Sequence, residues 1–550
     1  MRLDAILEHG RVWTGDAARP SASRVGVLGG RIVGLDEELD GVTADAVVDL
    51  GGAPVVPGFH DAHLHFSLYG QKLLRLDLSA TACPTLDDVY ATVRAAVDDA
   101  PAGTWILGRG HDQNKLGAHP TLAVLDSIAP EHPVYLEHTS GHMGVANGAA
   151  LRDAGHADLL RVPDLPGGHV ERDADGMPTG LLQERAQELV THRFLPVDLA
   201  THRAGSRLAS TALLAMGITS VTEPGIGAPG QVGQSPVELR AYQDGIEAGD
   251  IRLRIDAMPY HRVLHDLGGI GGGETGFGLD LGIRSGFGGD RLRIAGVKVL
   301  SDGSLIGRTA AMCCDFDDDP GNAGFLIDDV QDLTRTIVAA HANGWQVATH
   351  AIGDRALDAV LDAVAEAQRV APRHDPRHRI EHCGVSRPDQ LDRVASLGLI
   401  PSPQGRFVSE TGDGLLAAVG PERMAWVYRM RSWLDRGIVL PGSTDAPIVH
   451  ADPIWSMQDM VSRRTAAGAP LAPDEAVTAE EALRAYTFGS AYATRDEANR
   501  GSIARGRLAD LVVLSDDLLQ VDPSRIADVR VGATIVGGEV VHDTGAVTVR

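Results

Sequence analysis

The chain has 550 residues, of which 43% are hydrophobic, and it carries a formal net charge of −25 at pH 7. This length and apolar content allow a large core and two or more structural units, which excludes a small domain that depends on disulfides. The acidity would repel phosphate backbones and no basic stripe offsets it, so the composition argues against a nucleic-acid partner.

Short β-type runs separated by turns occupy the first part of the chain, residues 1–58. The same texture returns in residues 495–550, where the runs LADLVVLS and GATIVGGEVV are flanked by glycine and aspartate. Because chain termini often lie close together, we expect the two segments to form one small β-sandwich domain.

The middle of the chain, residues 59–494, alternates short apolar runs with stretches of helical period, as βα units do. The stretch at residues 67–204 is too long for a βα loop and is expected to be an inserted subdomain. Outside it, eight strands are predicted: VVPGFHDAHLHF, GITSVTEPG, LRIDAMPY, LRIAGVKVLSDGS, WQVATHAIGD, HRIEHCG, LGLIPSPQ and GIVLPGSTDAP. Eight such units predict an α/β fold, a (β/α)₈ TIM-like barrel whose chemistry lies at the carboxyl ends of the strands.

His63 and His65 lie two residues apart on the first predicted barrel strand. At that spacing both rings point to one face and can share a cation, and neutral imidazole suits zinc. With 22 histidines in the chain one such pair is expected by chance, so the pair alone leaves a structural role open. Its place after VVPG, at a strand end, favours a metal site.

Polar residues also end four later predicted strands: Lys298, His350, His382 and Asp445. Each alone could be a structural core or rim residue, but together with the first pair they predict a shared metal centre. Glu381, beside His382, is expected on the opposite strand face, away from the metal.

Lys298 is one of three lysines in a chain that otherwise uses arginine for its cations. A desolvated lysine, unlike arginine, can lose its proton and react with carbon dioxide to give a carbamate, a bidentate bridge between cations. The alternative is a buried lysine paired with an acid such as Asp302.

The motifs PGFHDAHLHF, KVLSDGS, THAIGD, RIEH and GSTDAP, with the terminal segment GSIARGRLADLVVL, occur in one order along the chain. In this set and order the chain resembles the amidohydrolase superfamily over essentially its whole length, and within it the long "amidohydrolase 3" subgroup that includes N-substituted formamide deformylases.

The resemblance implies two divalent metal ions, zinc being expected. His63, His65 and Asp445 would hold the more buried ion, His350 and His382 the other, and carboxylated Lys298 would bridge them. In the insert, segments that face the site in relatives match GRGHDQN and GHMGVANGAAL, which makes His111, Gln113 and His142 substrate-binding candidates. Relatives usually carry tryptophan where this chain has His111.

These residues predict a hydrolase that cleaves a non-peptide amide-type C–N bond, such as an N-substituted formamide, with a metal-activated hydroxide. Asp445 is the expected general base and then general acid. Lactone, carbamate or cyclic imide hydrolysis, or isomerisation, on the same centre stays an alternative, because fold does not settle chemistry. A non-catalytic metal-binding scaffold is the more distant one.

The expected location is the cytoplasm, because no signal-peptide layout or apolar run of membrane-spanning length is present and four cysteines form no disulfide framework. The expected partner is a small amide-type molecule, with no membrane and no nucleic acid. A homodimer is left open.

Overall fold

The computed structural model describes residues 2–139, 143–165, 168–228, 233–271 and 274–550. The chain forms two compact units. The larger unit comprises Met1–Phe66, Ala209–Gly233 and Val237–Arg550, and the smaller unit comprises Ser67–Leu208 and Gln234–Pro236. Within the described residues, no helix combines the length and apolarity needed to cross a membrane.

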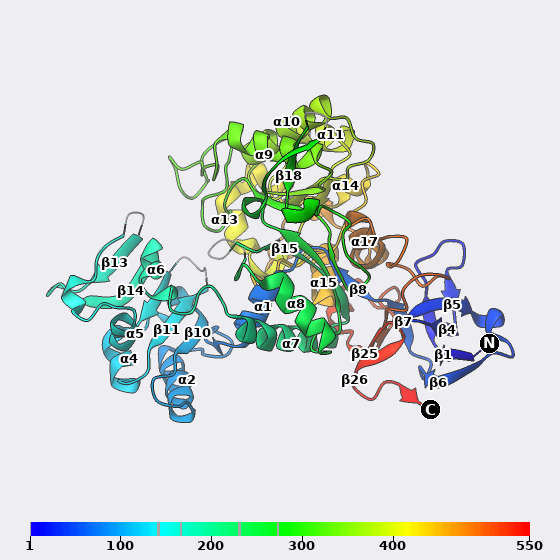
Figure 1. Ribbon diagram of the computed structural model, residues 1–550, viewed down its shortest axis with the longest axis horizontal. Helices are drawn as coiled ribbons and strands as arrows, with labels where there is room; N and C mark the ends of the chain where they lie inside the picture. Colours follow the sequence, from blue (N-terminus) through cyan, green and yellow to red (C-terminus); the bar gives the residue numbers. More distant parts are fainter. Residues whose placement is uncertain (1, 140–142, 166–167, 229–232, 272–273) are drawn as a thin grey trace. The chain divides into compact units, whose positions relative to one another are not determined.

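Two sheets at one end of the larger unit enclose an apolar core (Figure 1). One has the order β27 (Thr548–Val549), β6 (Thr43–Asp49), β1 (Arg2–Glu8), β4 (Val25–Leu28) and β5 (Arg31–Leu35). The other has the order β26 (Glu539–Asp543), β25 (Val531–Val536), β24 (Leu511–Leu514), β7 (Pro54–Pro57), β2 (Arg11–Trp13) and β3 (Ser21–Ala22). Both sheets therefore contain strands from the two ends of the chain.

Two four-stranded parallel sheets form the centre of the larger unit. The first has the order β19 (Leu292–Ile294), β16 (Arg254–Pro259), β15 (Ile218–Ile226) and β8 (Phe59–Asp61). The second has the order β20 (Val297–Leu300), β21 (Val347–Ala351), β22 (Arg379–His382) and β23 (Ile400–Ser402). All nine residues of β15 are buried, as expected for a parallel strand covered on both faces. A parallel bridge between Tyr260 and Lys298 joins the sheets.

Three of the predicted strands differ from the structure. The run VVPGFHDAHLHF is divided between β7 and β8, and the run LRIAGVKVLSDGS between β19 and β20; in each case the two strands belong to different sheets. The last predicted strand, residues 437–447, forms no regular strand. This segment instead runs alongside the residues that come after β8, because Ala62 N donates to Gly442 O at 2.9 Å and His65 N donates to Ala446 O at 2.9 Å. Asp445 has a positive φ of 65°, which interrupts the extended backbone that a strand requires.

Helices follow the central strands and carry apolar faces toward them. Figure 1 shows α9 (Val330–Ala342), α10 (Asp354–Val370) and α11 (Pro388–Ser396) close together, and α9 and α10 both contact β21 of the second sheet. The helix α15 begins where Asp452 accepts hydrogen bonds from Ile454 N and Trp455 N, with Pro453 in its first turn. The longer helices after β15 are α8 (Glu238–Glu247), α9 (Val330–Ala342), α10 (Asp354–Val370), α11 (Pro388–Ser396), α13 (Gly412–Arg423) and α15 (Pro453–Ser462).

The smaller unit is built on one mixed six-stranded sheet. Its order is β13 (Gly168–Arg172), β14 (Pro178–Glu184), β12 (Met143–Ala146), β11 (Val134–His138), β10 (Ile106–His111) and β9 (Leu76–Asp77). Its helices include α2 (Leu86–Asp99), α3 (Gln113–Leu116), α4 (Leu122–Ile128), α5 (Gly148–Asp153) and α6 (Glu188–Thr191). A capping box between Thr85 and Asp88 starts α2. The helix α7 (Leu199–Ala215) precedes β15.

Candidate metal centre

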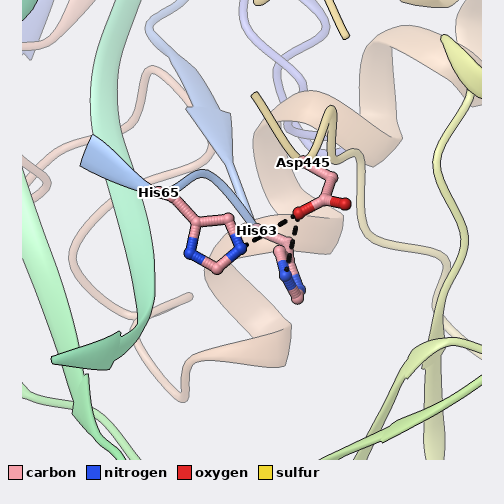
Figure 2. A group of neighbouring side chains, drawn as sticks. All are labelled: His63, His65 and Asp445. Carbon is pink, nitrogen blue, oxygen red and sulfur yellow. Dashed lines mark ion pairs between the residues drawn. The ribbon is translucent and has the colours of Figure 1, made fainter. Parts of the chain in front are cut away.

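His63, His65 and Asp445 converge on one point of the larger unit (Figure 2). Oδ1 of Asp445 lies 3.3 Å from Nε2 of His63 and 3.2 Å from Nε2 of His65. The prediction that both histidines lie on a strand is wrong, because β8 ends at Asp61 and the pair follows in a turn. The turn is held from two sides, by Leu64 N donating to Thr222 O and Asp445 N donating to His63 O.

The three side chains fit a bound cation. His63 is fully buried, and His65 and Asp445 are 8% and 6% exposed. Nε2 of His63 and Oδ1 of Asp445 are buried without a hydrogen-bond partner, which costs about 1–3 kcal/mol for each such group. Two imidazole nitrogens and one carboxylate oxygen are ligands that zinc takes in proteins, so a metal ion would satisfy these atoms.

Asp61 fixes the backbone on both sides of this cluster. Its Oδ1 accepts hydrogen bonds from His63 N at 3.0 Å and Thr444 N at 3.2 Å, and its Oδ2 accepts from the Thr444 hydroxyl at 2.6 Å. Burial raises the pKa of Asp61 to about 7. Sequence reasoning missed this residue, although it stands two positions before His63 in the same motif.

Glu381 contacts the back of the His63 ring, contrary to the prediction that it lies away from the site. Its Oε2 is bonded to Nδ1 of His63, and its two oxygens also accept from Nε and Nη2 of Arg379 at 2.7 and 2.9 Å. Although burial raises it, the Arg379 guanidinium and the His63 ring hold the pKa of Glu381 well below its usual range. The ionised carboxylate therefore holds the proton on Nδ1 and leaves Nε2 of His63 to bind a cation.

The reason for this difference is the backbone at the end of β22. Arg379 and Glu381 are two apart and point to the same side, as strand alternation requires. His382 reaches the site because its φ is +70°, which turns it out of the alternating pattern. The pair Arg379 and Glu381, two residues apart on a predicted strand, was the available signal, since two charges on one face of a buried strand require a partner or a function.

His350 and His382 lie beside His63. Ring centroids are 4.9 Å apart for His63 and His382, and 4.5 Å apart for His382 and His350. Nδ1 of His382 lies 2.8 Å from Oε1 of Gln404, and Nε2 of His350 lies 2.9 Å from Gly303 O. Burial and the neighbouring Lys298 lower the pKa of His350 to about 3, so its ring is neutral at pH 7.

Lys298 is 1% exposed on β20, and burial lowers its pKa to about 8 against the opposing pull of Glu381 and Asp445. Among the described residues, Lys298 and Asp302 do not form the ion pair that was the alternative. Asp302 accepts from the backbone N–H groups of Ala311, Ile352 and Gly353 at 2.7–3.0 Å instead.

Two of the three substrate-binding candidates, His111 and Gln113, fall in or beside the smaller unit's sheet. His111 is the last residue of β10 and is fully buried, and Gln113 is the first residue of α3. His142 lies outside the described residues.

Comparisons with known proteins agree with this arrangement. The model of the amidohydrolase family matches residues 46–542. An N-substituted formamide deformylase of Arthrobacter pascens is 33% identical, with 97% of each chain covered, and a putative amidohydrolase of Bacillus subtilis is 30% identical, with 90% of each covered. The crystal structure of an uncharacterised metal-dependent hydrolase from Pyrococcus horikoshii matches with a TM-score of 0.76 at 28% identity, covering 94% of this chain and 99% of that one. With the family model matched over residues 46–542 and three candidate ligand side chains assembled, this chain belongs to the amidohydrolase family and is a metal-dependent hydrolase.

Proposed function

We propose that the enzyme hydrolyses a non-peptide amide-type C–N bond, such as that of an N-substituted formamide, at a centre of two divalent metal ions. The observation that carries the proposal is the convergence of His63, His65 and Asp445, with partnerless buried ligand atoms, beside His350 and His382. The similarity to the Arthrobacter deformylase supports the substrate class.

In this proposal His63, His65 and Asp445 would hold one zinc ion, and His350 and His382 would hold the other. Lys298, carboxylated on Nζ, would serve as the bridging ligand. Its burial and lowered pKa support the bridge, because only the neutral amine reacts with carbon dioxide and a pKa of about 8 leaves roughly a tenth of it neutral at pH 7. When bound, such ions supply an acidified water and polarise the substrate carbonyl.

Asp445 moves the proton. The neighbouring His63 and His65 side chains outweigh burial and hold the pKa of Asp445 well below its usual range, so its carboxylate is ionised and can accept a proton at pH 7. It takes a proton from the water as the oxygen attacks the carbonyl carbon. As the C–N bond breaks, Asp445 gives that proton to the leaving nitrogen, and a carboxylic acid and an amine are formed.

The substrate contacts proposed from the insert are His111, Gln113 and His142. Each can donate a hydrogen bond to a carbonyl oxygen or its developing charge. Their test is a separation of kinetic constants: His142→Gln or Gln113→Ala should raise KM or lower kcat without changing metal content, and His111→Gln should also raise KM or lower kcat.

We also propose that the two four-stranded central sheets close into one (β/α)₈ barrel, residues 59–494, with an inserted subdomain at about 67–204 and a composite sandwich of residues 1–58 and 495–550. The backbone hydrogen bonds between residues 62–65 and 442–446 support closure on the β8 side, and the Tyr260–Lys298 bridge supports it on the other.

A cytoplasmic location and a small-molecule partner complete the proposal. The four cysteines are free thiols, which suits a reducing compartment. The net charge of −25 suits a small organic substrate better than a nucleic acid. Whether the chain forms a homodimer is a question for mass measurement in solution.

The deciding experiment combines elemental analysis with a substrate panel. The centre should account for about two zinc-like ions per chain of the purified protein, and the protein should release formate from N-substituted formamides. Turnover only of lactones, carbamates or cyclic imides, or isomerisation without hydrolysis, would move the assignment to those reactions. Protein with bound metal but no turnover of any of them would be a scaffold, and protein without metal that gains no activity from zinc, manganese or cobalt would sink the central claim.

A further inference from the structure

Three histidines gather at one edge of the smaller unit's sheet. The strands β10 and β11 are parallel neighbours in this sheet (Figure 1). His111 is the last residue of β10 and His138 the last of β11, and the two residues are paired. His119 comes from the segment between α3 and α4. All three belong to the smaller unit. The carboxyl ends of two adjacent parallel strands and a following loop thus bring three imidazoles together.

The backbone around Gly110 directs His111 into this group. The pairing of β10 with β11 shifts register between Arg109 and His111, and Gly110 adopts a φ of +105° that a side chain would not tolerate. Such a bulge re-aims the next side chain. Without it, strand alternation would put His111 on the face opposite to its observed one.

The distances between the three rings are close to those between imidazole ligands of one metal ion. Their centroids are 5.2 Å apart for His111 and His138, 5.8 Å for His111 and His119, and 6.0 Å for His119 and His138, all edge to face. Two imidazoles on one tetrahedral zinc have centroids about 5 Å apart, given zinc–nitrogen distances of about 2.0–2.1 Å. Asp112 offers a further ligand, because its Oδ1 lies 3.9 Å from Nε2 of His138.

Three ring nitrogens of the cluster are buried without a hydrogen-bond partner. His111 is fully buried, and both of its ring nitrogens lack a hydrogen-bond partner, as does Nδ1 of half-buried His119. A fully buried ring with two such nitrogens is a poor choice for packing, where an aromatic hydrocarbon would serve better. Burial and the other two rings lower the pKa of His111 to about 3, so it is neutral, the form that binds metals.

We propose that His111, His119 and His138, together with Asp112, bind one divalent transition-metal ion such as zinc, in addition to the centre at His63, His65 and Asp445. The ligand atoms of the three histidines converge less closely than those of that centre, so binding turns the rings about their Cβ–Cγ bonds. A metal takes one nitrogen of His111 and leaves the other for the substrate contact proposed above.

The test counts zinc in the full-length protein. Wild type, His119→Gln and His138→Gln are stripped with chelator, dialysed against buffered zinc and analysed for zinc per chain. Both variants should hold one zinc fewer than wild type, whatever number the first centre holds. A cobalt titration followed by visible absorption should show a tetrahedral site in wild type whose affinity falls more than about tenfold in either variant.

The matched control is His169→Gln, which removes an exposed histidine from β13 of the same unit and should keep the wild-type count. Circular dichroism and thermal melting of the metal-free proteins establish which variants fold, and if one does not, the other decides. Equal zinc in wild type and in each folded cluster variant would overturn the proposal, as would an equal loss in His169→Gln. Asp445→Asn in the first centre should leave the cluster's zinc and its cobalt spectrum unchanged, which separates the two sites.

Discussion

At the scale of single residues, Lys298 is the residue on which the proposed carbamate can be tested. Lys298→Arg keeps the positive charge but cannot form a carbamate, so it should lose metal and reduce activity by on the order of a thousandfold or more. Elemental analysis and formate release measure both effects. The control is Lys115→Arg, since Lys115 is exposed in the smaller unit. Normal activity in Lys298→Arg would make the lysine a structural cation and favour a single-metal site.

Replacing Asp445 tests proton transfer separately from metal binding. Asp445→Asn removes the group that accepts the proton of water, and we expect kcat to fall about 10²–10⁴-fold while at least one metal and the melting temperature survive through the histidines. Asp435→Asn, at an exposed aspartate, is the matched control. An unchanged kcat and pH profile would assign the base elsewhere, to His350 or His382 first.

Glu381 is a positioning residue, because it acts through the His63 ring. Glu381→Gln should weaken metal binding about 10–100-fold, and excess zinc should restore much of the activity. It should also destabilise the fold by about 3–5 kcal/mol, because Arg379 is left as an unpaired buried charge. Metal titration well below the melting temperature separates the effects, with Glu366→Gln, in an exposed ion pair, as control. Unchanged metal affinity would reduce Glu381 to a counter-ion for Arg379.

At the scale of elements, a buried charge cluster ties strands of the first central sheet to the segment after α17 (Ser490–Ala493). Asp256 on β16 accepts from Nε of Arg293 on β19 at 2.7 Å and from Nη2 of Arg500 at 2.6 and 2.8 Å. Asp256→Asn leaves two buried guanidinium groups short of counter-charge and should lower the free energy of unfolding by about 3–5 kcal/mol. Asp332→Asn, in an exposed pair, should change little.

The same cluster gives a pH dependence with a definite sign. The two arginines outweigh burial and hold the pKa of Asp256 far below the unfolded value of about 3.9. The stabilisation is therefore fully present above about pH 5 and is lost as the pH falls through the unfolded pKa towards the folded one. Urea unfolding from pH 7 to pH 3 should show wild type losing stability faster than Asp256→Asn. Parallel curves would show that Asp256 is not the group responsible.

At the scale of the larger unit, one buried ion pair connects the central strands to the terminal sheets. Arg254 at the start of β16 donates to Oδ2 and Oδ1 of Asp510, next to β24, at 2.6 and 2.8 Å, and Gly537 N also donates to Oδ1. Asp510→Asn should lower the melting temperature of this whole unit by several degrees, since a buried pair that loses one charge costs about 3–5 kcal/mol.

Calorimetry of Asp510→Asn tests whether terminal and central sheets unfold together. A single shifted transition is expected, because strands from both chain ends share one apolar core with Val55 of β7, which pairs with β24 and leads into β8. Glu539→Gln, at an exposed pair with Arg252, is the control and should melt as wild type does. An unchanged melting temperature in Asp510→Asn would show that the pair does not couple the two parts.

The sequence by itself determined which residue types take part in the candidate centre, their order along the chain, and the parallel strands on which Lys298, His350 and His382 lie. These features are local: a short run of strand length with a polar residue near its end is visible without any partner strand. The strands β20 and β21 are largely apolar runs of this kind, and the family motifs KVLSDGS and THAIGD lie at their ends.

Only the tertiary structure decided which side chains meet. Strand alternation predicted Glu381 on the face away from the site, but the positive φ of His382 lets both Glu381 and His382 reach it. The positive φ of Asp445 likewise goes with an irregular segment in place of the last predicted strand. In the histidine cluster, His111 and His138 meet through the pairing of β10 with β11. Left-handed backbone at non-glycine positions and long-range pairing leave no periodic trace in a sequence, because both are stabilised by contacts between residues far apart in the chain.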